Sequence, residues 1–287
     1  MTLLRIGTRG SLLALAQTKI IADKISDTWP DVKTEIVKIT TTGDKNMSPF
    51  SSDPSGIKGM FTLEIEQALM NHEIDIAVHS LKDLPANMNP ELPIVAYSQR
   101  GDPRDALVVN DGADSDVIGS SSLRRRLQLE RLYPNRKILP IRGNITTRLR
   151  RLDSGEFGGL VLAVSGLERL GMSHRISRVF SADEVMPAPG QGILACQGRI
   201  DGDYEYLSCV DDSDSRDCAL AERAFSRALN AACNVPIGAY AVVDGEILTL
   251  KGLYIDEASR SFYRGEISGK RSDAESLGQK LAEVIML

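Results

Sequence analysis

Four side chains able to move protons or hold anions follow a short apolar run at residues 74–78: His79, Ser80, Lys82 and Asp83. The run is rich in β-branched residues, which predicts a buried strand, and Pro85 closes the polar cluster after it. Ligands of open α/β sheets bind at the carboxyl ends of strands. The pattern therefore makes Asp83 a candidate acid–base residue; a strand end with a solvated Lys-Asp turn is the alternative.

A second candidate lies at the first strand-to-helix turn. Residues 3–8 read as a strand, Gly10 turns the chain, and Ser11 suits the N-cap of a helix over residues 12–25. Arg9 would then lie beside a helix N-terminus, where backbone N–H groups favour anions. Taken alone, Arg9 reads equally well as a surface arginine.

Basic residues are concentrated between residues 121 and 151, where ten Lys and Arg face a single acidic residue, Glu130. Ser121 and Ser122 open a predicted helix that runs to about Leu132, and a second helix is predicted over residues 145–152, with Asn144 as its N-cap. A charge run is usually a solvated helix face. Here, however, four arginines fall at helix starts or turns after strands, which favours a site for a small polyanion: Arg124, Arg125, Arg142 and Arg148.

Two further segments could carry chemistry. Residues 43–59 show no periodicity, which is typical of a functional lid or of disorder. Lys58 could reach a ligand from there, and a solvated lysine is an equally good interpretation. Cys233 lies in a loop of small residues before Pro236, although a buried structural cysteine is the plainer interpretation. The three histidines lack metal-ligand spacing, so no metal site is expected.

The elements that must position these residues fall into two α/β halves and an α+β tail. The first half alternates strands and helices, which predicts a mostly parallel sheet, and residues 102–105 read as a hinge or boundary. Gly190-Gln191-Gly192 follows two prolines and reads as a hinge rather than a dinucleotide fingerprint. Residues 201–217 are acidic and expected at the surface. The tail is predicted to hold a helix over 219–229, a three-stranded meander over 240–267 and a closing helix over 274–285.

Composition bounds the class of protein. The 287 residues suit two or three domains of an ordinary soluble protein, with 42% hydrophobic and 25% charged residues. A net charge of −5 and only 5% aromatic residues argue against a nucleic-acid binder. No apolar run approaches the ~18 residues of a membrane span, and Arg5 and Arg9 interrupt any signal peptide. Four cysteines without a Cys-x-x-Cys pattern suggest a reducing, cytoplasmic compartment, and a monomer is expected.

Taken together, these segments resemble the porphobilinogen deaminase (hydroxymethylbilane synthase) family over essentially the whole chain. The resemblance is carried by seven motifs in the right order: residues 8–11 with Leu13-Ala14 and Gln17, 75–83, 102–105, 121–125, 142–144 with Thr147-Arg148, 189–192, and 233–238.

The resemblance implies an α/β protein of three domains. Two domains resemble periplasmic binding proteins with a cleft between them, and the third is a small C-terminal α+β domain. The implied bounds are residues 1–98 with 193–209, residues 99–192, and residues 210–287.

The resemblance also implies a reaction. Members join four molecules of porphobilinogen, releasing ammonia each time, to a dipyrromethane cofactor bound as a thioether to the cysteine matching Cys233. Hydrolysis then frees hydroxymethylbilane for haem and other tetrapyrrole biosynthesis. Asp83 matches the catalytic carboxylate. Matched cofactor-binding positions are Cys233, Lys82, Ser80, Ser122, Arg124, Arg125, Arg148 and Asp83. Matched substrate-binding positions are Arg9, Ser11, Lys58, Arg142, Arg175 and Ser121.

The chain departs from the family pattern at three places. Residues 54–57 stand where the family often has a lysine and two glycines, Gln197-Gly198 replaces the usual Glu-Cys, and Asn230-Ala231-Ala232 precede Cys233 where glycines are common. The alternative function is a two-lobed cytoplasmic anion-binding protein without catalysis. Cys233 distinguishes the two, because a binding protein has no use for a covalently loaded cysteine.

Overall fold

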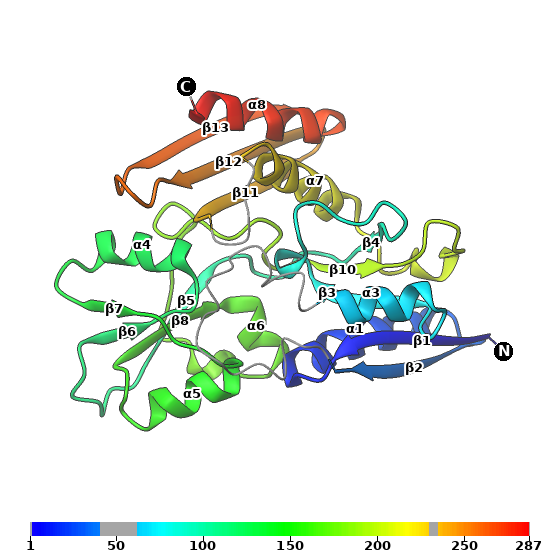
Figure 1. Cartoon of the computed structure of the whole chain (residues 1–287), viewed down its shortest axis with the longest axis horizontal. Helices are drawn as coiled ribbons and strands as arrows, with labels where there is room; N and C mark the ends of the chain where they lie inside the picture. The colour runs from blue at the N-terminus through cyan, green and yellow to red at the C-terminus, as the bar shows by residue number, and fades with distance from the viewer. Residues whose placement is uncertain (1, 41–61, 230–234, 287) are drawn as a thin grey trace.

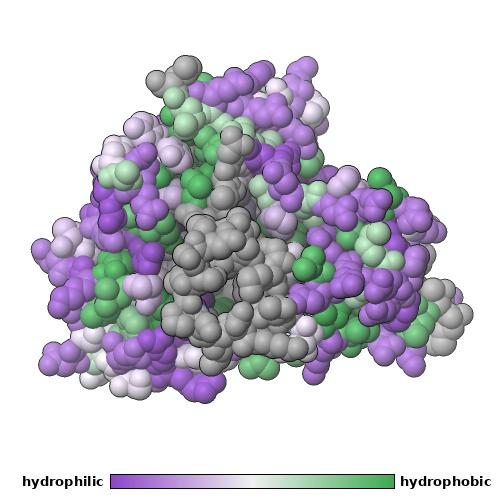
Figure 2. All heavy atoms as spheres, viewed as in Figure 1, coloured by the Kyte–Doolittle hydropathy of each residue, from purple (hydrophilic) through white to green (hydrophobic). Residues whose placement is uncertain are grey.

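The computed structural model describes residues 2–40, 62–229 and 235–286, which form three sheets with helices packed on them (Figure 1). Cys233 and Lys58 lie outside these residues. None of the described helices is long and apolar enough to cross a membrane. Hydrophilic side chains cover most of the outer surface seen in Figure 2.

The first sheet has the strand order β2-β1-β3-β10-β4. Its strands are β1 (Thr2–Arg9), β2 (Val32–Ile39), β3 (Ile76–Ser80), β4 (Ile94–Tyr97) and β10 (Leu194–Gln197). Helix α1 (Leu12–Thr28) packs on one face, where Ile21 and Ile25 share a core with Val78. Helix α3 (Leu63–Met70) packs near Ala77 on the opposite face, as expected because neighbouring strand residues point to opposite sides.

The second sheet repeats that arrangement in the order β7-β6-β8-β5-β9. Its strands are β5 (Asp105–Val109), β6 (Val117–Gly119), β7 (Lys137–Leu139), β8 (Gly159–Ala163) and β9 (Arg178–Val179). Its helices are α4 (Leu123–Leu132), α5 (Ile145–Asp153) and α6 (Val164–Arg169).

Both sheets are mixed, but the prediction of a mostly parallel first sheet is confirmed, because only β10 runs against the other four strands. Strand β1 runs parallel to β2 and β3, but β10 is antiparallel to β3 and β4; likewise β5 is antiparallel to β8 and β9. The antiparallel strand of each sheet is the one that arrives from the other sheet. Strand β5 follows a first crossing, residues 98–104, and β10 follows a return crossing, residues 180–193.

The third sheet is an antiparallel meander of β11 (Ile237–Asp244), β12 (Ile247–Ile255) and β13 (Phe262–Lys270). Helices α7 (Ser213–Ala228) and α8 (Ala274–Met286) cover one face, where Phe225 and Leu281 pack against Leu250. On the other face Leu253 packs against Leu127 of α4, so this unit rests on the second one.

The helix predicted from residue 219 begins at Ser213, because the side chain of Asp212 caps it by accepting from Ser215 N–H. Leu207, Val210 and Ser215 are buried, so the prediction of a surface segment over 201–217 was wrong at these positions.

Candidate active site

The turn after β3 orients Lys82 and Asp83 outward. Ser80 ends the strand, and its hydroxyl exchanges hydrogen bonds with the Gln17 amide of α1 at 2.9 and 3.1 Å. The 3₁₀ turn η3 (Leu81–Asp83) follows, and Leu81 is buried in the core. Because Leu81 points inward, the next two side chains face away from the core. Asp83 is exposed to solvent and Lys82 is half-buried.

Lys82 contacts the return crossing. Its Nζ donates to Gln191 Oε1 at 3.3 Å. Burial lowers the pKa of Lys82 to about 8, and the positive charge of Arg125 adds to that effect. The ammonium of Lys82 is therefore held in a place that already carries positive charge, a favourable setting for an anion.

The two arginines at the start of α4 converge on Asp105. Ser122 caps the helix by accepting from Arg125 N–H, and both arginine side chains are buried. Arg124 Nη2 lies 2.9 Å from Asp105 Oδ2, and Arg125 Nη2 lies 2.7 Å from Asp105 Oδ1. Asp105 is fully buried, and the two guanidinium groups hold the pKa of its carboxyl well below the usual range although burial opposes them.

Gln191 joins the groups from the two sheets. Its Nε2 donates to Asp105 Oδ1 at 2.7 Å and to the Pro103 carbonyl at 2.6 Å. Its Oε1 accepts from Lys82 and from Arg125, each at 3.3 Å. The sequence interpretation missed Asp105 and Gln191 as site residues, because both lay in segments assigned as hinges. The sequence feature that could have indicated Gln191 is its polar amide between Gly190 and Gly192.

Arg148 extends the positive group from α5. Asn144 caps that helix by accepting from Thr147 N–H at 2.9 Å, as predicted, and Arg148 Nε donates to the Gly143 carbonyl at 2.7 Å. Burial lowers the pKa of Arg148 to about 10, with Arg125 contributing in the same direction and Asp83 opposing it. Arg148 thus lies within electrostatic range of groups from both sheets.

The remaining predicted site residues differ from this group in their exposure and their partners. Ser11 caps α1 by accepting from Ala14 N–H at 3.2 Å, and Arg9 is half-buried at the end of β1. Arg142 and Ser121 are exposed. Arg175 is paired with Asp153 at the last residue of α5, the opposite end of that helix from Asn144. The structure therefore gathers Lys82, Asp83, Arg124, Arg125 and Arg148 but leaves Arg175 in an ion pair elsewhere.

The group fits an anionic ligand with several carboxylates. Four cations, from Lys82, Arg124, Arg125 and Arg148, outnumber the carboxylates of Asp83 and Asp105. Arg125 Nε is buried without a hydrogen-bond partner in the described part of the chain. A buried donor without a partner is costly, and a ligand carboxylate would relieve that cost. Across the described residues, no cluster of three or more His, Cys, Asp or Glu side chains could hold a metal ion.

Comparison with known proteins decides the family. Residues 4–206 match the family described as "Porphobilinogen deaminase, dipyromethane cofactor binding domain", and residues 217–286 match "Porphobilinogen deaminase, C-terminal domain". The chain belongs to the porphobilinogen deaminase family. It is 46% identical to the porphobilinogen deaminase of Ruminiclostridium josui, covering 98% of this chain and 96% of that protein. The enzyme of Thermus thermophilus is 41% identical over 98% of this chain and 94% of its own length.

Membership makes the chain a transferase of tetrapyrrole biosynthesis, a hydroxymethylbilane synthase with a dipyrromethane cofactor. The alternative of a binding protein without catalysis finds no support among these relatives.

Solved structures with a similar shape include a TRAP periplasmic solute binding protein from Desulfovibrio salexigens, at a TM-score of 0.40 and 8% identity over 77% of this chain and 75% of that one. An ABC transporter protein from Parabacteroides distasonis has a TM-score of 0.42 and 13% identity over 80% and 75% of the two chains. The predicted fold of two α/β units and a small α+β unit is confirmed by the three sheets themselves.

Proposed function

We propose that this chain joins four porphobilinogen molecules head to tail and then frees hydroxymethylbilane by hydrolysis, acting as a cytoplasmic monomer. We propose further that the dipyrromethane cofactor is held by a thioether to Cys233. The observation that carries the proposal is the excess of buried and half-buried cations beside the exposed carboxylate of Asp83.

The cations suit the substrate. Each porphobilinogen ring bears an acetate and a propionate, so a growing chain is a polycarboxylate. Arg125 and Arg148 offer forked donors from a partly dehydrated setting, and Lys82 adds a point charge. Because the pKa of Lys82 is about 8, its side chain is mostly protonated at neutral pH and can bind a carboxylate.

Asp83 suits the chemical step. Loss of ammonia from porphobilinogen leaves a positively charged pyrrole with an exocyclic methylene. A carboxylate beside the ring N–H stabilises that charge and assists proton transfer. When bound, the cofactor supplies the pyrrole carbon to which the first substrate is joined. Because it is tethered, the acceptor need not be recaptured for each addition.

Sheet membership supports the domain bounds expected from the sequence. We propose one domain of residues 1–98 with 193–209, a second of 99–192 and a third of 210–287. Support comes from β10, which pairs with β3 and β4, and from β5, which pairs with β8 and β9.

Physical chemistry favours Cys233 over the other cysteines as the attachment point. Burial raises the pKa of Cys196 and of Cys218 to about 12, which leaves almost no nucleophilic thiolate at either position. Cys209 is half-buried and lies close to the Tyr206 carbonyl. Cys233 lies outside the described residues, so its assignment rests on the family motif at residues 233–238.

The mass of the purified protein tests the proposal. Wild type should exceed the mass of the bare chain by two pyrrole units, and the excess should survive dithiol reductants because a thioether is not a disulfide. Cys233→Ser should lack the excess and be inactive, whereas Cys196→Ser, Cys209→Ser and Cys218→Ser should keep both adduct and activity. An adduct that persists in Cys233→Ser, or active wild type with the bare mass, would overturn the assignment. Sedimentation at the mass of one chain would support the monomer.

A further inference from the structure

Asp105 is the centre of a buried polar cluster formed by three segments that are distant in sequence. It is the first residue of β5, directly after the first crossing, and its side chain is fully buried. Its Oδ2 accepts from Arg124, and its Oδ1 accepts from Arg125 and from Gln191 of the return crossing. One carboxylate therefore joins α4 to the return crossing, and Gln191 in turn donates to the Pro103 carbonyl of the first crossing.

The cluster fixes the two guanidinium groups at more than one point. Besides Asp105, Arg124 donates to the Met186 carbonyl, and Arg125 Nη1 donates to the Val161 carbonyl at 3.4 Å. Held this way, Arg125 keeps its buried Nε without a partner in the described part of the chain. Asp105 thus fixes the orientation of the Arg125 guanidinium group and leaves its Nε–H available to a ligand.

Stability alone is a poor explanation of this cluster. Replacing a buried ion pair or triad by well-packed apolar side chains is often neutral or stabilising, because desolvation offsets the attraction between the charges. A buried carboxylate between two arginines is better explained by the geometry that it imposes. Gln191 adds to that geometry, because its amide donates to Asp105 and accepts from Lys82.

We propose that Asp105 is the positioning residue of the cofactor site. Its two oxygens orient Arg124 and Arg125 toward the carboxylates of the dipyrromethane and of the growing chain, and Gln191 holds the Asp105 carboxylate in the required orientation. This inference rests on the proposed function.

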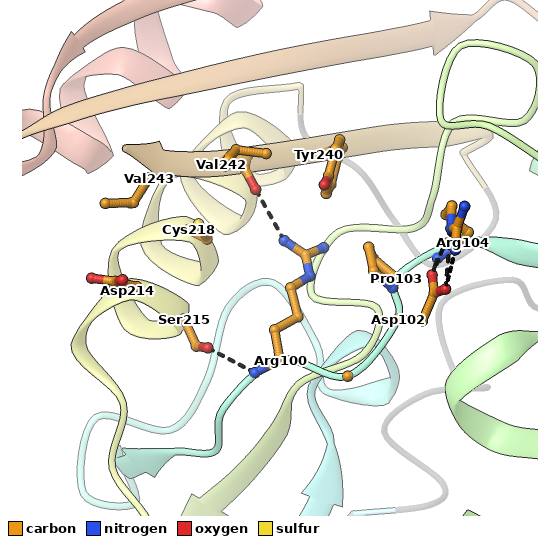
Figure 3. Close-up of a pocket in the computed structure, with 12 residues that line it drawn as sticks. Arg100, Asp102, Pro103, Arg104, Asp214, Ser215, Cys218, Tyr240, Val242 and Val243 are labelled. Atoms are coloured by element: carbon orange, nitrogen blue, oxygen red, sulfur yellow. Dashed lines mark hydrogen bonds and ion pairs between the residues drawn. The ribbon is translucent and has the colours of Figure 1, made fainter. Parts of the chain in front are cut away.

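The chain offers a matched control three residues earlier. Asp102 lies in the same crossing and pairs with Arg104, with Nη2 2.6 Å from Oδ2, but Arg104 is exposed. In Figure 3, Asp102 and Arg104 face each other beside Pro103, at the rim of a hollow of about 450 Å³ between the first crossing and the third unit. Asp102→Asn therefore makes the same chemical change at an ion pair that does not join the cluster.

The experiment compares Asp105→Asn, Asp105→Glu and Asp102→Asn by three measurements: the fraction of protein carrying the cofactor mass, kcat and KM for porphobilinogen, and thermal unfolding. Asp105→Asn removes the charge and should reduce cofactor loading about tenfold or more. Asp105→Glu keeps the charge but displaces both guanidinium groups by about one methylene. It should fold like wild type and yet lose roughly 100-fold in kcat, because misplacement by about 1 Å costs that much.

The pH dependence of kcat/KM distinguishes a positioning role from a purely structural role, which would leave it unchanged. Arg124, Arg125, Asp83 and Asp105 are the charged groups that act on Lys82, and Asp105 raises its pKa. Removing that negative charge should move the alkaline limb of kcat/KM to lower pH in Asp105→Asn. The limb should stay in place in Asp102→Asn.

Wild-type loading, kcat and pH profile in Asp105→Glu would overturn the positioning role, and so would equal losses in Asp102→Asn. If Asp105→Asn does not fold, Asp105→Glu decides alone. Failure of the proposed function is distinguishable, because wild type itself would then lack the cofactor mass.

Discussion

Burial separates the arginines that the sequence presents as one basic run. Arg124 and Arg125 are buried against Asp105, and Arg148 is half-buried, whereas Arg136 is exposed and Arg151 is paired with Glu156 near the surface. An exposed ion pair contributes little to stability, whereas a charged donor in a dehydrated site contributes about 1.5–3 kcal/mol to the binding of an anion. Of these five arginines, only Arg124, Arg125 and Arg148 are therefore expected to affect the substrate.

Arg148→Leu tests this distinction. We expect a loss of roughly 10- to 150-fold in kcat/KM for porphobilinogen, the equivalent of one charge-assisted hydrogen bond. Arg136→Leu and Arg151→Leu should stay within about twofold of wild type. Similar losses in all three variants would show that the arginines act as a general field of charge.

Asp83→Asn should fold normally and lose nearly all turnover. The side chain is exposed, so replacing the carboxylate by an amide keeps its shape and disturbs no core contact. It removes the negative charge proposed to stabilise the cationic pyrrole. The rate of porphobilinogen consumption tests the loss of turnover, and thermal unfolding tests whether the variant folds normally. A rate near that of wild type would remove Asp83 from the mechanism.

His79 should make the protein sensitive to mild acid. It is only 8% exposed, and burial lowers its pKa from 6.5 to about 4. Between these values the unfolded chain binds a proton that the folded chain does not. Stability is therefore complete above about pH 6.5 and falls as pH drops toward 4, by about 3 kcal/mol at most. Urea unfolding should show a shallower decline for His79→Gln over this range, and equal slopes would contradict the assignment.

At the scale of elements, the two crossings are in direct contact. Gly101 N–H donates to the Gly192 carbonyl at 3.1 Å, and Arg169 from the end of α6 donates to the same oxygen. Gly192 has φ +96°, and a Cβ there would lie 2.5 Å from the Gly101 carbonyl oxygen. A glycine is therefore required at position 192 for the two crossings to lie this close to each other.

Gly192→Ala should accordingly destabilise the protein. The backbone strain alone costs about 1–3 kcal/mol, and the clash with Gly101 adds to it. Gly112→Ala is the control, because its Cβ would make only an ordinary contact at 3.6 Å. Chemical unfolding measures both; a Gly192→Ala variant as stable as Gly112→Ala would show that the crossings move apart readily.

At the scale of the whole molecule, Glu222 of α7 ties the third unit to both crossings. Its carboxylate is fully buried and accepts from Arg100 at 2.7 Å, from Gly190 N–H at 2.6 Å and from Ala241 N–H at 2.7 Å. Figure 3 shows Arg100 extending from the first crossing toward β11. Because Arg100 also donates to the Gln191 carbonyl, this contact reaches the residue that joins Lys82 to Asp105.

Glu222→Gln should lower the free energy of unfolding by about 3–5 kcal/mol, because it leaves Arg100 buried without a counter-charge. Glu266→Gln is the control, since that carboxylate is exposed and lies 3.9 Å from Lys251. It should change stability by less than about 0.5 kcal/mol. Urea unfolding of both variants makes the comparison, and equal effects would refute the role of Glu222.

The sequence by itself determined the local elements. Ser11 and Asn144 cap helices where the pattern predicted caps, and Ser122 caps the helix that was predicted to start there, because capping is an interaction over three residues. The apolar run before Ser80 is a buried strand, because periodicity and β-branching are local properties. The seven motifs also indicated the family, which the comparisons confirm.

The tertiary structure alone decided the strand order, the reversed direction of β5 and β10, and the centre of the site. The order of strands cannot be read locally when β5 and β10 each arrive from the other sheet. Asp105 and Gln191 lie 86 residues apart, and Lys82 and Gln191 lie 109 apart, so no spacing in the sequence pairs them. A buried carboxylate becomes identifiable only when the fold supplies the two arginines that compensate its desolvation.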